Sequence, residues 1–300
     1  MSHTPAPASS DAARSSARRN PDGSLSVGDV VGLVEAAAPP VLAASWDSNG
    51  LICGDPSDPV RSILLAVDPV TAVVDEAIDS GVDMVITHHP LYLRGTEHVA
   101  ATDPKGRSVH RLIRAGIALL NAHTSLDAAH GGVAEALADR VGLTSTVPLE
   151  PDPAFPDQGI GRIGVLPQPV ALRRLAADVA AVLPDSVPGL LVGGDLDAVV
   201  ERIAVSGGAG DSLLQRAREA GADVFITADL RHHPTSEHLE GGRPYLLCGT
   251  HWATEWVGLE PLARRLEESA RSQGSSLTAR VSRIVTDPWA LRLSTGTDRA

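Results

Sequence analysis

Aromatic residues are scarce in this chain of 300 residues, where they make up only 3% of the total. A folded core must therefore consist mainly of Ala, Val, Leu and Ile. The sequence also has only two cysteines, Cys53 and Cys248, too few for a disulfide framework. This usage is typical of a reducing compartment, so we expect a cytoplasmic protein. Both thiols are expected to be small buried groups, with Cys248 as a metal ligand the alternative.

The chain lacks any apolar run near the roughly 20 residues that a membrane-spanning helix needs, so we expect no membrane insertion. It also lacks an excess of basic residues. Lys and Arg total 25 against 37 Asp and Glu, which gives a formal net charge of −12. An acidic surface repels phosphate backbones and disfavours nucleic acid as a partner. Metal cations, by contrast, are attracted to clustered carboxylates and imidazoles.

The ends of the chain carry no pattern of a folded element. Residues 1–25 are rich in Ala, Ser, Pro and Arg and contain no continuous apolar stretch. We predict a disordered tail there, and a short tail at 294–300. A secretory signal is excluded by the missing apolar stretch, whereas a transit peptide is the weaker alternative because of Asp11 and Asp22.

Two stretches of the chain resemble each other at a constant offset of 140 residues. The first is residues 63–90 and the second is residues 203–234. The matching positions are Ile63 and Ile203, Ala77 and Ala217, Gly81 and Gly221, Asp83 and Asp223, Ile86 and Ile226, and Thr87 and Thr227. The repeat is too long for a solenoid, so we interpret it as the duplication of one α/β unit.

Short buried strands alternate with amphipathic helices in both copies, which predicts largely parallel sheets joined by right-handed crossovers. We expect an α/β protein of two similar half-domains, with mixed sheets and a dinuclear metal site between them. The first half should span 26–148 and the second 162–293, the latter closed by C-terminal strands at 278–285 and 290–293. Residues 149–161 are rich in proline and predict a linker.

The pair His88 and His89 follows the predicted strand 84–87 and is fixed by Pro90. Ligands of parallel sheets bind beyond the carboxyl ends of the strands. Adjacent residues point in different directions, so the two imidazoles could serve two different metal ions. The alternative is a chance histidine pair in an exposed turn, but the position at a strand end favours a functional site.

A histidine and an acid lie four residues apart after two further strands: His123 with Asp127, and His251 with Glu255. If these residues enter the first turn of a helix, each pair lies on one helical face, as in shared cation sites. The alternative is an acid placed there by the helix dipole. Because the pattern occurs in both copies, we favour ligands.

Together these residues offer five nitrogen and oxygen donors without cysteine. Structural zinc would use four ligands and favour thiolates, whereas five such donors suit two divalent ions about 3.5–4 Å apart. Zinc, manganese or iron would each accept imidazole and carboxylate, and the sequence does not choose among them. The predicted metal ligands are His88, His89, Asp127, His251 and Glu255.

Two other motifs leave alternatives open. The glycine-rich segment 207–210 lies between a predicted strand and helix, and it could form a phosphate-binding nest or only a tight turn. His232 and His233 repeat the first histidine pair four residues further from their strand, so we expect pocket lining rather than ligands. Trp46, Asp47 and Asn49 could line the same pocket or serve only as turn and packing residues.

The chain resembles the NGG-interacting factor three-like family, also described as GTP cyclohydrolase I type 2 homologs. The resemblance covers about residues 27–293 and is carried in family order by SWDSNGLICG, VITHHPLY, NAHTSLDAAHGGV, GIGRIG, SGGAGDSLL and HWATEW. It implies two similar α/β domains, a dinuclear metal site with the same five ligands and a bridging Glu255, and a toroidal homohexamer. This chain has Thr227-Ala228 where Thr-Gly is typical, and Thr250-His251 where Gly-His is typical.

The resemblance favours a metal-dependent hydrolase of the GTP cyclohydrolase type, acting on a nucleotide-like substrate through a water between two divalent ions. His123 and His233 are the predicted proton-transfer residues. A non-enzymatic protein for metal storage, delivery or interaction could use the same ligands. A purely structural metal that clamps the two halves together is the third alternative.

Overall fold

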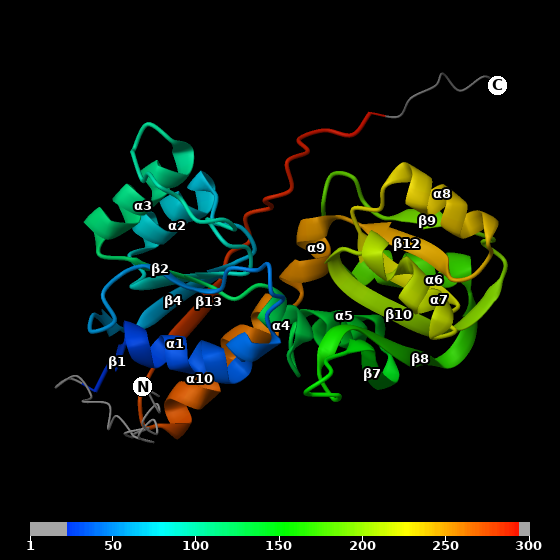
Figure 1. Cartoon of the computed structure of the whole chain (residues 1–300), viewed down its shortest axis with the longest axis horizontal. Helices are drawn as coiled ribbons and strands as arrows, with labels where there is room; N and C mark the ends of the chain where they lie inside the picture. Colours follow the sequence, from blue (N-terminus) through cyan, green and yellow to red (C-terminus); the bar gives the residue numbers. More distant parts are fainter. Residues whose placement is uncertain (1–22, 294–300) are drawn as a thin grey trace, which may run out of the picture.

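The computed structural model describes residues 23–293, which form two lobes, each built around one β-sheet (Figure 1). The first lobe holds a five-stranded sheet in the order β13-β4-β5-β6-β2. Its strands are β2 (Gly50–Cys53), β4 (Ser62–Ala66), β5 (Met84–Thr87), β6 (Ala118–Asn121) and β13 (Thr278–Val281), with a separate ribbon of β1 (Leu25–Ser26) and β3 (Pro59–Val60). Most of the predicted tails, residues 1–22 and 294–300, lies outside the described residues. The predicted N-terminal tail 1–25 ends too late, because Leu25 is buried in β1 and pairs with Val60.

The second lobe holds a six-stranded sheet in the order β7-β8-β10-β11-β12-β9. Its strands are β7 (Thr144–Pro151), β8 (Gly159–Ala171), β9 (Leu191–Gly193), β10 (Val199–Ala209), β11 (Val224–Ala228) and β12 (Tyr245–Gly249). In each sheet three consecutive strands are parallel and are followed by an antiparallel edge strand. The predicted α/β fold with mixed sheets is thus confirmed, and the shared strand order is compatible with duplication. The first sheet is largely parallel as predicted, whereas in the second β7–β8, β8–β10 and β12–β9 pair antiparallel.

The repeated acids Asp83 and Asp223 have the same structural role in both lobes. Asp83 Oδ2 accepts hydrogen bonds from the backbone N–H groups of residues 61 and 62, each at 2.8 Å. Asp223 Oδ2 accepts from the backbone N–H groups of residues 201 and 202, each at 2.9 Å. Each carboxylate therefore fixes the start of one strand beside the start of the next. This structural role explains why both copies of the repeat have an aspartate here, away from the predicted metal ligands.

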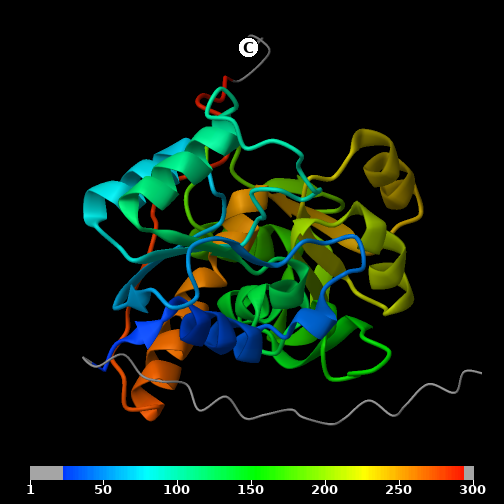
Figure 2. The same ribbon diagram turned by 60° about the vertical axis from the view of Figure 1, so that its left-hand side comes forward.

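Helices cover both faces of each sheet (Figures 1 and 2). In the first lobe α2 (Thr71–Ser80) and α3 (Pro104–Ala115) pack on one face, and α1 (Val27–Ala37) and α10 (Leu259–Ser272) on the other. Successive residues of a strand point to opposite faces of the sheet and so pack into two separate hydrophobic cores. Leu64 and Val85 face α2 and α3, whereas Ile63 and Ile86 face α1 and α10. None of the described helices is both long and apolar enough to span a bilayer.

In the second lobe, too, helices pack on both faces of the sheet. Its sheet packs against α5 (Val133–Val141) and α6 (Leu172–Val182) on one face, and against α7 (Leu214–Glu219) on the other. The remaining helices are η1 (Pro40–Leu42), α4 (Thr124–Ala128), η2 (Asp211–Leu213), α8 (His232–Glu240) and α9 (His251–Trp256). Within α9, Trp252 and Ala253 belong to the core of the first lobe, so α9 bridges the two lobes.

The structure corrects two of the predicted boundaries. The segment 149–161 is not a simple linker, because β7 continues to Pro151 and Glu150 pairs with Ile160 of β8. The C-terminal elements also do not close the second half: β13 pairs in parallel with β4 of the first lobe, and no strand forms at 290–293. The chain therefore returns to the first lobe after α9.

Candidate metal centre

The predicted ligands lie where strand ends of the two lobes meet. His88 and His89 directly follow β5, and their backbone N–H groups still bond to the carbonyls of residues 66 and 67 at 3.0 and 2.8 Å. His123 precedes α4, which carries Asp127 one turn later. His251 is the first residue of α9, directly after β12. The carboxyl ends of parallel strands therefore supply the site, as expected for sheets of this kind.

Glu255 lies at the centre of this cluster and is only 3% exposed. Its Oε1 atom is 2.9 Å from His251 Nε2 and 3.5 Å from His88 Nε2, and its Oε2 atom is 3.1 Å from His89 Nε2. His88 Nε2 is also 3.6 Å from Asp127 Oδ1. One carboxylate thus contacts three imidazoles, and the structure brings all five predicted ligands together.

Every imidazole of the cluster is held through its Nδ1 atom, which leaves Nε2 for the site. His88 Nδ1 lies 3.1 Å from the Ala122 carbonyl, which accepts its proton. Aspartates hold the other three, with Nδ1 to carboxylate distances of 2.7 Å: His89 by Asp68, His123 by Asp47 and His251 by Asp229. Such outer partners fix the tautomer and orientation of metal-ligating histidines.

The Nε2 atom of His88 is buried and has no hydrogen-bond partner among the described residues. With the proton of neutral His88 on Nδ1, this nitrogen directs a lone pair at the carboxylates of Asp127 and Glu255. A buried lone pair facing two carboxylates is unfavourable unless a cation lies between them. The donor set therefore fits divalent metal ions.

The pKa values show how strongly the cluster favours positive charge. Burial opposes protonation of His89, but its hydrogen bonds to Asp68 and Glu255 outweigh it and raise its pKa to about 10. The same balance, with Glu255 as the main partner, raises the pKa of His251 to about 9. Burial raises the pKa of Asp127 to about 6, whereas the surrounding imidazoles hold that of Glu255 well below its usual value. Without metal, protons supply the charge that these carboxylates need.

His123 lies beside the five predicted ligands, with its ring centre 5.2 Å from that of His88. Burial and the neighbouring His88 lower its pKa, against the opposing effect of Asp47. Two overlapping groups of side chains have ligand atoms close enough to hold a metal ion: His88, His89 and His123, and His89, His251 and Glu255. His123 is therefore placed for proton transfer at the site or for ligation.

His233 is not brought to the cluster. Both His232 and His233 are exposed in the first turn of α8, and their rings lie 5.1 Å apart. Among the described contacts of His233 there is none to the five predicted ligands. Its role in proton transfer stays a prediction that this geometry does not favour.

The aspartates behind the imidazoles were missed or undervalued in the sequence. Asp68 follows β4 and Asp229 follows β11, so both stand at strand ends beside the histidines that they hold. Asp229 adopts φ of +50°, a strained conformation for a residue with a side chain, as is common at functional sites. Position 229 corresponds to position 89 at the repeat offset of 140 residues. This correspondence with His89 could have marked Asp229 as a residue of the site.

The glycine-rich segment is not a phosphate nest. β10 continues to Ala209, and the Gly208 N–H donates to the Thr254 hydroxyl at 3.0 Å. The Gly210 N–H donates to the Ala228 carbonyl at 3.2 Å. Since these amides already have partners inside the protein, the glycines serve instead to let β10 approach α9 closely.

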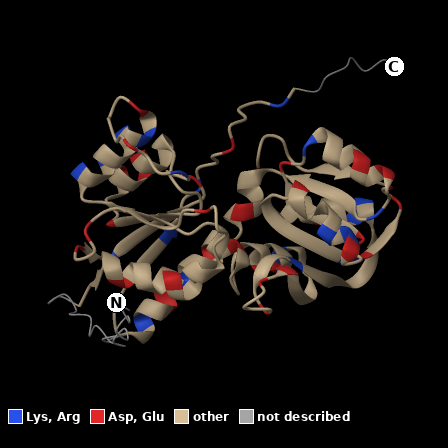
Figure 3. Cartoon of the chain, in the orientation of Figure 1, with Lys and Arg blue, Asp and Glu red and all other residues tan. Residues whose placement is uncertain are grey.

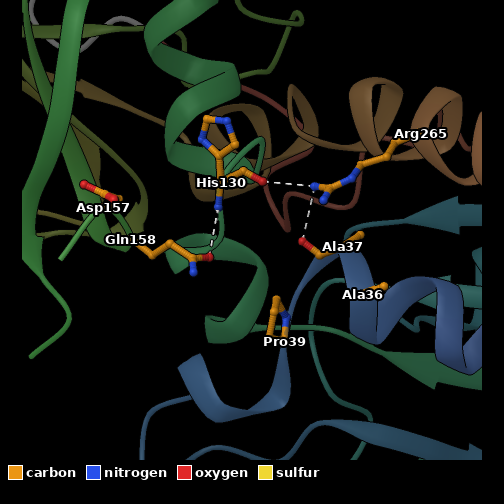
Figure 4. A pocket seen from close by; sticks show the side chains of 7 residues that line it. All are labelled: Ala36, Ala37, Pro39, His130, Asp157, Gln158 and Arg265. Atoms are coloured by element: carbon orange, nitrogen blue, oxygen red, sulfur yellow. Dashed lines mark hydrogen bonds between the residues drawn. The ribbon is translucent and has the colours of Figure 1, made fainter. Parts of the chain in front are cut away.

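A separate cavity of about 390 Å³ contains none of the clustered residues (Figure 4). Arg265 of α10 points into it and donates to the carbonyls of Ala37 at 3.3 Å and His130 at 3.0 Å. The His130 N–H in turn donates to the Gln158 side chain at 3.4 Å. These bonds join segments that are distant in the sequence, so the polar groups of this cavity have a structural role.

The fold and the cluster define a class of two-lobed α/β proteins with imidazoles and carboxylates at the junction that are able to hold metal ions. The model of the Duf34/NIF3 (NGG1p interacting factor 3) family matches residues 25–288, and the chain belongs to this family. A Streptomyces coelicolor protein named GTP cyclohydrolase 1 type 2 homolog is 47% identical over 268 residues, which cover 89% of this chain and 94% of that protein.

Other relatives agree with this membership. A Mycobacterium tuberculosis protein of the same name is 35% identical over 384 residues, covering 92% of this chain and 100% of that protein. The crystal structure of a hypothetical protein from Staphylococcus aureus is similar with a TM-score of 0.83 and 27% identity, covering 90% of this chain and 100% of that one. A Bacillus cereus protein related to NIF3 shares the fold with a TM-score of 0.83 at 24% identity, covering 90% and 99%.

Proposed function

We propose that His88, His89, Asp127, His251 and Glu255 hold two divalent metal ions, and that the site hydrolyses a nucleotide-like substrate. The observation that carries this proposal is the central position of Glu255, whose two oxygens lie 2.9–3.5 Å from three imidazole nitrogens. A carboxylate in that position suits a bridge between two ions. Zinc, manganese and iron all accept this donor set.

Two bound divalent ions would supply a water of lowered pKa and would polarise an electrophilic carbon or phosphorus. The protein supplies orientation and proton transfer. Asp47, whose side chain is fully buried, holds His123 through Nδ1 and leaves its Nε2 atom free to accept or donate a proton at the site. The lowered pKa of His123 favours a neutral imidazole that can act as a base.

The names of the relatives motivate a GTP-type substrate, because several are called GTP cyclohydrolase 1 type 2 homolog. Acidic positions occur on both lobes and at their junction, including on α9, and the view shows no continuous basic stripe (Figure 3). This distribution supports a small-molecule substrate over nucleic acid. The homohexamer and the cytoplasmic location remain predictions, and light scattering of the purified protein tests the former.

The test is to assay protein loaded with Zn, Mn or Fe against GTP and a panel of nucleotides, nucleosides and purine bases. Hydrolysis by the wild type and a loss of at least a hundredfold in Glu255→Gln would support the proposal. Glu260→Gln is the matched control, because Glu260 lies on α10 and pairs with Arg140 at 3.1 Å, away from the cluster. An untouched panel, with no effect of Glu255→Gln, would overturn the hydrolase assignment.

Metal delivery is a second candidate, favoured by the partial exposure of three predicted ligands, among them Asp127 with 20% of its side chain exposed. The side chains of His89 and His251 are 20% and 31% exposed, so an ion between them could exchange with solvent or a partner. Exchange of labelled zinc within minutes, without turnover of any nucleotide, would support delivery. Slow exchange together with turnover would support the enzyme.

A further inference from the structure

A cavity of about 600 Å³ opens directly onto the metal centre, because His89 and His251 are among its lining residues. One wall comes from the second lobe, including Leu191 and Cys248. The other comes from the segment after β13, which passes between the two lobes in Figure 1. A ligand in this cavity would therefore touch the residues that the proposed function places at the metals. The inference below rests on that function and specifies its substrate.

The segment after β13 brings a tryptophan and an aspartate into the cavity wall. Thr286 donates to Asp68, the residue that holds His89, and so anchors the segment beside the metal centre. Trp289 lines the cavity and is 64% exposed, in a chain with only four tryptophans. An exposed indole is costly to keep in water, and it offers a flat face for stacking on a planar ring.

Asp287 lines the same cavity, and its Oδ2 atom is buried without a hydrogen-bond donor among residues 23–293. A buried carboxylate oxygen needs a donor, because burial without a partner costs free energy. Asp68 already uses both oxygens, on His89 and Thr286. Asp229 uses Oδ2 on His251. Asp287 and Asp229 are therefore the lining carboxylates with an oxygen left for N–H groups of a ligand, and Asp287 is the one beside Trp289.

Phosphate groups find little support in this cavity. Its lining includes the three acids Asp68, Asp229 and Asp287, and among residues 23–293 no Lys or Arg lines it. Arg292 is the residue to test, since its guanidinium would come 4.0 Å from a Cβ atom built on Gly189, next to the lining residue Pro188. Carboxylates repel the several negative charges of a triphosphate. The charge of two metal ions would be offset by six nearby carboxylates, those of Asp47, Asp68, Asp127, Asp229, Glu255 and Asp287.

We propose that this cavity binds the planar heterocycle of a purine base or nucleoside, with its face on Trp289 and its N–H edge on Asp287. The 5′-phosphates of a nucleotide contribute no binding free energy there. The ring then lies against His89 and His251, within reach of the metal centre. The substrate class is thus the base or nucleoside rather than the triphosphate.

The test is calorimetric titration of metal-loaded protein, first shown by elemental analysis to hold two ions per chain, with guanosine, GTP and 1-methylguanosine. Guanosine should bind at least as tightly as GTP, and 1-methylguanosine, which lacks the N1–H donor, about tenfold more weakly. Trp289→Ala and Asp287→Asn should each weaken guanosine binding about tenfold, the range expected for one stacked base or one lost bond to a charged group. Trp289→Phe should retain binding, and Arg292→Ala should not change it.

Guanosine that fails to bind while GTP binds, with GTP affinity lost in Arg292→Ala, would overturn the proposal. Equal affinity of wild type and Trp289→Ala for guanosine would also overturn it. The two proposals fail separately: absent metal refutes the proposed function, whereas two bound ions without purine binding refute only the assignment of the cavity. Circular dichroism confirms that each variant is folded before titration.

Discussion

A side chain at Gly208 would collide with Glu255: a Cβ atom built there lies 2.3 Å from Glu255 Oε1 and 3.0 Å from His251 Nε2. Gly208 also adopts φ of +66°. We predict that Gly208→Ala displaces the Glu255 carboxylate and reduces the metal content from two ions to fewer than one per chain. Elemental analysis of the purified variant measures this loss.

The control for that variant is Gly242→Ala. Gly242 has φ of +88°, but a Cβ atom there would meet nothing within 4 Å. This substitution should cost about 1 kcal/mol of unfolding free energy from backbone strain and leave two ions bound. If Gly208→Ala also retained both ions, the close approach of β10 would have no bearing on the site.

The aspartates behind the imidazoles should tune metal affinity without contributing ligand atoms. We predict that Asp229→Asn weakens metal binding by about 10- to 100-fold, because the amide no longer holds the Nδ1 proton of His251 with a charged acceptor. Competition with a chelator of known affinity measures the change. Asp178→Asn, on the exposed face of α6 and paired with Arg174, should behave as wild type. Unchanged affinity in Asp229→Asn would show that the contact is incidental.

Asp47 should stabilise the fold in a pH-dependent way. Burial alone would raise its pKa, but hydrogen bonds from Thr124 and His123 outweigh burial and lower the pKa from 3.8 to about 2. Its stabilising contribution is therefore present above pH 4 and is lost as the pH falls toward 2. We predict that Asp47→Asn costs about 2 kcal/mol at pH 7 in metal-free protein, and that the difference from wild type shrinks below pH 4. Urea unfolding at pH 7, 5 and 3 tests this prediction, and a constant difference would contradict it.

Arg162 should be a structural residue with a large effect on stability. Its guanidinium is 2% exposed and donates to the carbonyls of Gly159, Gly161 and Ala129 at 2.7, 2.8 and 3.2 Å. Arg162→Met leaves these carbonyls and Glu135 without their donor, so we expect a loss of about 3 kcal/mol in unfolding free energy.

The matched control is Arg173→Met, because Arg173 pairs with Asp197 on the surface, where such pairs contribute about 0–1 kcal/mol. Denaturant unfolding compares the two variants. Similar losses in both would mean that the buried bonds of Arg162 contribute little.

The sequence predicted the strands and the proximity of the five candidate ligands well where local pattern determines structure. β5 has the predicted bounds Met84–Thr87, because a short apolar run before a histidine pair reads as a buried strand that ends at a site. His251 and Glu255 share one face of α9 as their spacing requires. The bounds of this strand and the spacing of this pair are both determined by residues close together in the sequence, so they can be predicted from it.

The failures concern relations that only the folded chain creates. The proline-rich stretch predicted a linker, but β7 is the edge strand of its sheet, where proline is tolerated. The apolar pattern of β13 does not encode which sheet it joins, and it joins β4. Asp68 and Asp229 look like ordinary turn residues until their histidines are placed beside them. The role of His233 in proton transfer stays a prediction, although α8 places this residue at the surface.

The most direct test of the account is anomalous X-ray diffraction from crystals of metal-loaded protein, recorded at the absorption edge of the bound metal. Two bound ions should give two anomalous peaks about 3.5–4 Å apart at the junction of the lobes. Glu255 should lie between them, and the Nε2 atoms of His88, His89 and His251 should lie about 2.0–2.2 Å from one of them. A single peak, or peaks away from Glu255, would contradict the account.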